Sequence, residues 1–220
     1  NKKKSLWQFF QMLGKTFMFP IALLSVCGML LGIGSAFTNS SLIEAVPLLG
    51  NPVLQKIFSF MTTLGLFAFN NLGVLFAMAI PLGLLKEEKE FGAFTGLVSF
   101  MAMHIGTNFY LTITDQLAAA DKMTEAGQGM ILGIQTYNTS VLGGIIAGLM
   151  VFWLYPKISK VKIPEALGFY SGPRLAPIAM LVIMGIFGMV AVPLFWQPFY
   201  NFFKMIGEWI STSGPIGYFS

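Results

Sequence analysis

The chain has 220 residues, of which 55% are hydrophobic and only 10% charged, with a mean hydropathy of +0.74 and a formal net charge of +4. A soluble domain carries about 25% charged residues, so this composition excludes a water-soluble globular protein and indicates an integral membrane protein in a lipid bilayer. The basic residues lie in short groups at the ends of apolar segments, which argues against a nucleic-acid-binding protein.

The chain begins with lysines and aromatic residues, and then becomes continuously apolar. Residues 1–15 predict an amphipathic segment at the cytoplasmic membrane interface, although a simple helix start fits the same pattern. The first membrane span follows over about 16–37 and contains Gly28-xxx-Gly32, a spacing that lets another helix approach closely. A second span covers about 57–85, which is longer than the ~20 residues that a bilayer requires.

Two adjacent asparagines, Asn70 and Asn71, interrupt the second span. Amide side chains in hydrocarbon are unfavourable unless they find hydrogen-bond partners. The pair therefore indicates a helix break, a bond between helices or the wall of a water-lined cavity. We favour a structural hydrogen bond, but the sequence leaves all three open.

Three further spans are predicted, over about 92–112, 140–155 and 176–196. The polar residues 113–137 between the third and fourth spans predict an exposed loop with short helical pieces. The fifth span is expected to continue past two prolines to Trp209 as a kinked helix. We therefore predict an all-α transmembrane bundle of about five spans.

The lysines and the arginine indicate the orientation of this bundle. Cytoplasmic connections carry an excess of Lys and Arg, and alternate connections here divide them ten to three. This division predicts a cytoplasmic N terminus. The larger group is Lys2, Lys3, Lys4, Lys15, Lys86, Lys89, Lys157, Lys160, Lys162 and Arg174, and the smaller is Lys56, Lys122 and Lys204.

Motifs for catalysis are missing from the sequence. It has no phosphate-binding P-loop, no HExxH and no Cys/His set, so we expect neither a cofactor nor a metal and assign no catalytic residue. The single histidine, His104, is compatible with a proton relay, but we favour a histidine bonded within the bundle. No Asp or Glu lies in the middle of a span, which argues against an ion-coupled symporter.

The loop over 162–177 is the most unusual connection, because charge, aromatic residues and glycine alternate in it. It contains Gly172 and the only arginine, Arg174. Two interpretations are open: a contact with a ligand or partner, and a cationic anchor that fixes the fifth span at the cytoplasmic face.

Seven segments carry a resemblance to one family by their sequence, order and spacing: residues 14–24, 28–35, 50–54, 72–83, 132–135, 141–148 and 163–177. On these segments the chain resembles the membrane-embedded IIC component of the bacterial phosphoenolpyruvate-dependent sugar phosphotransferase system, glucose family, maltose or glucose type.

The resemblance implies a bacterial inner (cytoplasmic) membrane protein that takes up a sugar, maltose or glucose, with coupled phosphorylation. It implies a homodimer in which residues 16–210 form the five-span scaffold half. Residues 211–220 would then begin the connection to a second half that holds most of the sugar site. The phosphoryl donor would be a phosphorylated IIB domain, and Cys27, which lies in the first span, is not its reactive cysteine.

The resemblance also suggests a role for the loop, whose family pattern matches at Gly172 and Arg174. We expect these two residues to meet the docking IIB domain or its phosphoryl group, since guanidinium pairs well with phosphate. The competing functional hypotheses are a structural dimerisation module without transport and a secondary carrier.

Overall fold

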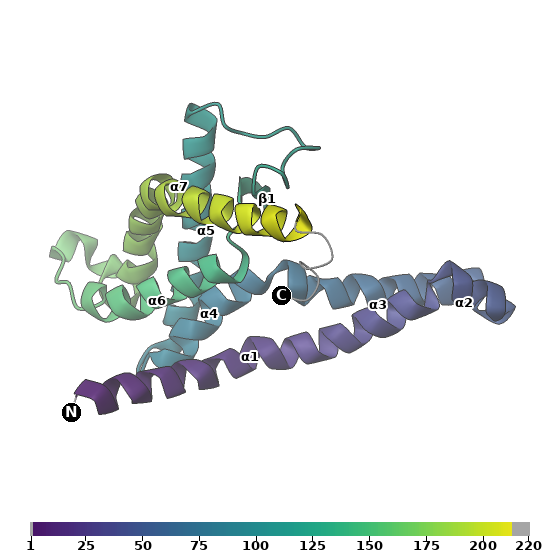
Figure 1. Cartoon of the computed structure of the whole chain (residues 1–220). Coiled ribbons are helices and arrows are strands. Elements are labelled where there is room, and N and C mark those ends of the chain that lie inside the picture. Colours follow the sequence, from purple (N-terminus) through teal and green to yellow (C-terminus); the bar gives the residue numbers. More distant parts are fainter. Residues whose placement is uncertain (1, 213–220) are drawn as a thin grey trace.

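The structure is a computed structural model that describes residues 2–212. It is almost entirely helical, with one short hairpin (Figure 1). In chain order the elements are α1 (Lys2–Phe37), α2 (Ser40–Ala45), η1 (Pro47–Gly50), α3 (Pro52–Asn70), α4 (Leu72–Leu84), α5 (Lys89–Ile113), β1 (Gln128–Ile131), β2 (Ile134–Tyr137), α6 (Ser140–Ile158), η2 (Glu165–Tyr170), η3 (Gly172–Arg174) and α7 (Leu175–Thr212).

The predicted all-α membrane bundle is confirmed. Within the described residues, α1, α3, α6 and α7 contain stretches long and apolar enough to cross a membrane, and α5 is a fifth long helix with a more polar composition. Residues 2–15 continue directly into the first span as one helix. The expectation of short helical pieces within 113–137 is wrong, because this connection forms turns and a two-stranded hairpin. The predicted connection over 211–220 lies mostly outside the described residues.

Helices α1 and α3 run antiparallel and project from the rest of the molecule as an arm (Figure 1). The buried stripe of α1 is narrow, with Pro20, Cys27 and Gly34 spaced seven residues apart. At Gly34 a β-carbon would lie 2.6 Å from the carbonyl oxygen of Phe58, and at Gly65 it would lie 2.6 Å from that of Cys27. The two backbones therefore touch directly, while most of the arm's apolar surface stays outward.

Helices α4, α5, α6 and α7 form the compact part of the molecule and share one apolar core. Glycines again let backbones meet: a β-carbon at Gly144 of α6 would collide with the carbonyl of Gly73 on α4, and one at Gly188 of α7 with the carbonyl of Met103 on α5. A hydrogen bond from Thr107 Oγ1 to the Gly188 carbonyl, 2.9 Å long, crosses the second contact. Close backbone approach is thus the main packing device of the bundle.

Helix α7 changes direction sharply along its length (Figure 1). Its first part packs on α5, and its second part crosses over the bundle. Pro193 and Pro198 lie inside the helix, and each proline lacks the N–H that an unbroken helix requires. The expectation that the fifth span continues past both prolines to Trp209 as a kinked helix is confirmed.

The glycine contacts give a matched pair of substitutions. Gly144→Ala should destabilise the bundle by about 1–3 kcal/mol, because the added methyl group must displace the α4 backbone. Gly32→Ala, in the Gly28-xxx-Gly32 pair of α1, should leave stability unchanged since no atom lies within 4 Å of the added carbon. Thermal unfolding in detergent measures both, and equal melting temperatures would contradict the packing described.

Candidate functional site

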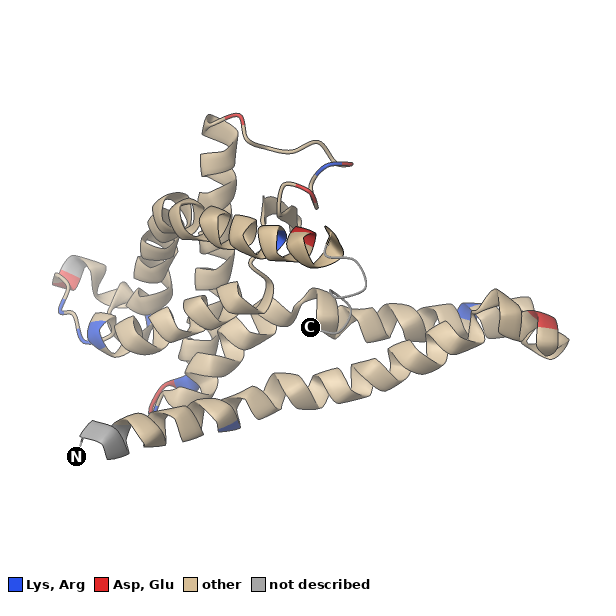
Figure 2. Ribbon diagram, in the orientation of Figure 1, with Lys and Arg blue, Asp and Glu red and all other residues tan. Residues whose placement is uncertain are grey.

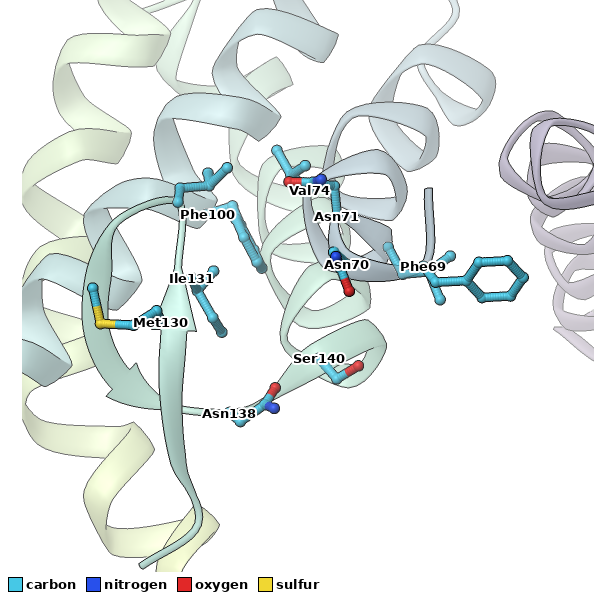
Figure 3. Close-up of a pocket in the computed structure, with 12 residues that line it drawn as sticks. Phe69, Asn70, Asn71, Val74, Phe100, Met130, Ile131, Asn138 and Ser140 are labelled. Atoms are coloured by element: carbon cyan, nitrogen blue, oxygen red, sulfur yellow. The ribbon is translucent and has the colours of Figure 1, made fainter. Parts of the chain in front are cut away.

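A polar cavity of about 330 Å³ lies where α3 ends and α4 begins, between the hairpin and the start of α6 (Figure 3). Asn70, Asn138 and Ser140 surround its open space, while the ring of Phe69 points away from it. The full lining is Phe69, Asn70, Asn71, Leu72, Gly73, Val74, Phe100, Met130, Ile131, Leu132, Asn138 and Ser140. This lining has amides, a hydroxyl and backbone groups but no charged side chain.

The asparagine pair creates the cavity by ending α3. Asn71 has φ −114° and ψ 17°, outside helical values, and its Nδ2 donates a 2.8 Å hydrogen bond to the Phe67 carbonyl. Asparagine competes for backbone groups in this way, which makes it a helix terminator. Of the three possibilities raised by the sequence, the structure therefore shows the helix break and the cavity wall.

The first turns of α4 and α6 lie against each other at the cavity. At Gly73 a β-carbon would lie 2.6 Å from the Ser140 carbonyl oxygen. Neither helix has a side-chain hydrogen bond at its N-cap. The first N–H groups of a helix have no intrahelical acceptor and carry the positive end of its dipole. The N-terminal ends of α4 and α6 therefore offer backbone hydrogen-bond donors at the cavity to an oxygen atom that is neutral or carries a partial negative charge.

Ser140 is a strained residue of the lining. Its φ is +46°, a left-handed conformation that is unfavourable for a residue with a side chain. The residue before it, Thr139, is buried and its Oγ1 has no hydrogen-bond partner among the described atoms. The chain thus enters α6 through an unfavourable backbone geometry that places the Ser140 side chain at the cavity.

The hairpin supplies the opposite wall. Leu132 and Gly133 form its turn with φ of +50° and +82°, the positive pair of values that a tight hairpin turn requires. Asn108 Nδ2 on α5 donates a 2.7 Å hydrogen bond to the Gln135 carbonyl, which ties β2 along this helix. The hairpin is therefore held beside the bundle rather than projecting freely.

His104 fixes the same hairpin from deeper in α5. Its ring is almost fully buried, with Nδ1 3.3 Å from Thr136 Oγ1 on β2, and it stacks edge-on against Phe100 at 4.5 Å between centroids. Nε2 has no partner among the described atoms. The histidine is not part of the cavity lining, so its bonding supports the structural interpretation that we favoured from the sequence.

The two loop residues singled out in the sequence lie elsewhere. The connection between α6 and α7 is at the far left of Figure 1, away from the cavity. Gly172 has φ +70° and open space around it. Arg174 folds back on its own loop: Nη1 donates a 3.2 Å hydrogen bond to the Phe169 carbonyl, and the guanidinium lies 4.8 Å from the Phe169 ring centroid. Both residues shape the loop, and neither lines the polar cavity.

Sequence reasoning missed Asn138 and Ser140. The signal was present, since Asn138, Thr139 and Ser140 are three consecutive polar residues immediately before an apolar span. Nothing in the sequence indicated that the hairpin would bring them opposite Asn70.

Most charged residues lie near the ends of the helices and in the connections, with Lys15 inside α1 as an exception, and the core of the α4–α7 bundle is free of them among the described residues (Figure 2). One end carries the 86–90 turn, with two lysines and three glutamates, and the loop between α6 and α7, in which basic residues outnumber acidic ones. The fold and this distribution define a polytopic helical membrane protein with an uncharged polar cavity.

Comparison with known proteins specifies the family. Residues 14–220 match the family described as "Phosphotransferase system, EIIC", so the chain belongs to the EIIC family of the phosphotransferase system. It is 43% identical over 217 residues to the "PTS system maltose-specific EIICB component" of Escherichia coli (strain K12). That alignment covers 98% of this chain and 41% of the relative, so the chain spans about two fifths of its length.

We predict that water reaches the cavity. In a chain with Cys27 replaced by serine, Asn138→Cys should react quickly with a charged, water-soluble thiol reagent in native membranes. Leu64→Cys, on the apolar outside of the arm, should react slowly because a thiolate does not form in lipid. Equal rates at the two positions would show that the cavity is not hydrated.

Proposed function

We propose that this chain is part of the membrane component of a phosphoenolpyruvate-dependent phosphotransferase system that takes up maltose with coupled phosphorylation. The observation that carries the proposal is the 43% identity, over 98% of the chain, to a maltose-specific EIICB component. Membership of the EIIC family supports sugar uptake in general. Glucose is the alternative substrate within the same reaction class.

The chemistry of the chain agrees with an uncharged, hydroxylated substrate. A sugar in a membrane protein needs hydrogen-bond donors and acceptors without net charge. The cavity at the start of α4 and α6 offers amides, a hydroxyl and free helix N–H groups and no ionised side chain. It supports a polar route for sugar, while most of the binding site belongs to the further half that the family resemblance implies.

The partner that we propose is a phosphorylated IIB domain, which the B in the relative's name supports. Because basic connections favour the cytoplasmic side of a bacterial inner membrane, we place the 86–90 turn and the loop with Gly172 and Arg174 there. Arg174 has a hydrogen bond to a backbone carbonyl and no ion pair among the described residues, so its charge is available to a phosphoryl group.

We also propose that the protein is a homodimer and that residues 16–210 form the scaffold half of each copy. The α1–α3 arm supports it because large apolar side chains cover the outside of the arm. They include Met18, Phe19, Val26, Met29, Phe60, Leu64 and Phe67, each at least 43% exposed. A second copy could bury this surface, as could lipid, and crosslinking discriminates between them.

The first test is transport by the full-length protein. In a bacterial host without its own maltose uptake, we expect radiolabelled maltose to accumulate as a phosphorylated sugar, and only when phosphoenolpyruvate and the soluble phosphotransferase proteins are supplied. Accumulation of unmodified maltose would replace the proposal with a secondary carrier. An inactive full-length protein that still dimerises would support a purely structural module.

A second test concerns the loop. Arg174→Ala in the full-length protein should lower phosphorylation-coupled uptake by about tenfold, the effect of losing one charge-assisted contact. Lys122→Ala, on the connection before the hairpin, is the matched control and should change nothing. Crosslinking between copies through Phe60→Cys should proceed equally in both variants. Unchanged uptake in Arg174→Ala would mean that this residue only anchors α7 at the membrane surface. If Phe60→Cys gave no crosslinked dimer, the proposed homodimer would be contradicted.

A further inference from the structure

A groove and an adjoining pocket lie at the other end of the bundle, between the first turns of α1 and the end of α6. The two helices touch there through Phe9 and Phe152, whose ring centroids are 5.8 Å apart. An apolar groove of about 490 Å³ adjoins this ring pair and is lined by Phe9, Ile146, Leu149, Met150, Phe152 and Trp153.

A pocket of about 420 Å³ shares Phe152 with this groove but has different chemistry. It contains two lysines, Lys86 and Lys160, and two glutamates, Glu87 and Glu88, with Ser159 and Tyr155 beside them. Tyr155 donates a 2.9 Å hydrogen bond to Glu88 Oε2, which holds that carboxylate in place. Among the described side chains, Lys86, Glu87 and Lys160 have no ion pair, so three charges face the pocket unpaired.

Along α6, the apolar residues of the groove are followed by the polar residues of the pocket, the order expected from the hydrocarbon core of a bilayer to its surface. The groove residues run from Ile146 to Trp153, and the polar pocket follows up to Lys160. Trp153 is 65% exposed and lies under the Lys157 ammonium, 4.6 Å from it. An exposed tryptophan beside a lysine at a helix end is typical of the membrane–water interface. From Ile146 to Ile158, where α6 ends, the helix rises about 18 Å, comparable to a lipid acyl chain.

We propose that this groove and pocket together bind one phospholipid whose headgroup carries both a phosphate and a primary ammonium, as in phosphatidylethanolamine. The acyl chain lies along the groove, Lys86 and Lys160 donate to the phosphate, and Glu87 accepts from the ammonium. Charge complementarity selects this occupant, because a lining with two cations and two carboxylates matches a zwitterion. A purely anionic headgroup would leave the carboxylates facing a phosphate. A choline headgroup has no N–H to donate to them.

The test is lipid binding by the purified chain in detergent, followed by native mass spectrometry and thermal unfolding. Phosphatidylethanolamine should be retained about tenfold better than phosphatidylcholine or phosphatidylglycerol of the same acyl chains, the ratio expected for one charge-assisted contact, and should raise the melting temperature most. Glu87→Gln should remove the preference over phosphatidylcholine, and Lys86→Gln with Lys160→Gln should weaken retention of all three lipids.

Two further variants separate the headgroup from the chain. Ile146→Trp fills the groove at a position 40% exposed, so it should abolish retention while the chain stays folded. Lys122→Gln, a cation remote from the pocket, should bind lipid as the wild type does.

Three results would overturn the proposal. Equal retention of the three lipids would mean a nonspecific lipid annulus, and a preference for phosphatidylglycerol unaffected by Glu87→Gln would mean an anion site. If the lysine substitutions left lipid binding intact but abolished binding of a phosphorylated IIB domain, the pocket would be a protein docking surface.

Discussion

The structure depends on direct contact between helix backbones. In lipid, apolar side chains gain nothing by leaving one hydrocarbon environment for another, so helices associate through close packing and hydrogen bonds. Gly73, Gly144 and Gly188 permit that packing by leaving space for a neighbouring carbonyl. The same contacts set the position of the polar cavity, because Gly73 and Ser140 bring the starts of α4 and α6 together.

Several polar side chains of the bundle make specific hydrogen bonds, within one helix or between neighbouring elements. Asn71 bonds to its own helix and ends it, Asn108 secures the hairpin, and Thr107 links α5 to α7. Charges lie mostly near the ends of the helices and in the connections (Figure 2). The interior therefore offers hydrogen bonding without ionisation, which agrees with the sugar transport that we propose.

Much of the fold was predictable because a bilayer imposes a length and a composition on any helix that crosses it. The spans over about 16–37 and 140–155 correspond to α1 and α6, and the kinked end of α7 followed from its prolines. The hairpin was not predictable, since residues 113–137 lack the strand alternation that would reveal it. Only one side of the cavity could be predicted from the sequence. Asn70 and Asn71 stood out in an apolar span, whereas Asn138 and Ser140 line the cavity only because the fold brings two distant segments together.

The unusual composition of α5 has a consequence for how the protein is made. This helix is not among the segments apolar enough to cross a membrane on composition alone. The partners of His104 and Asn108 lie in the hairpin, and one partner of Thr107 lies in α7. When α5 is synthesised, none of those partners has yet been added to the chain. Stable insertion of α5 therefore depends on segments translated up to 81 residues later, and an error at Gly188 disturbs a helix that was completed long before it.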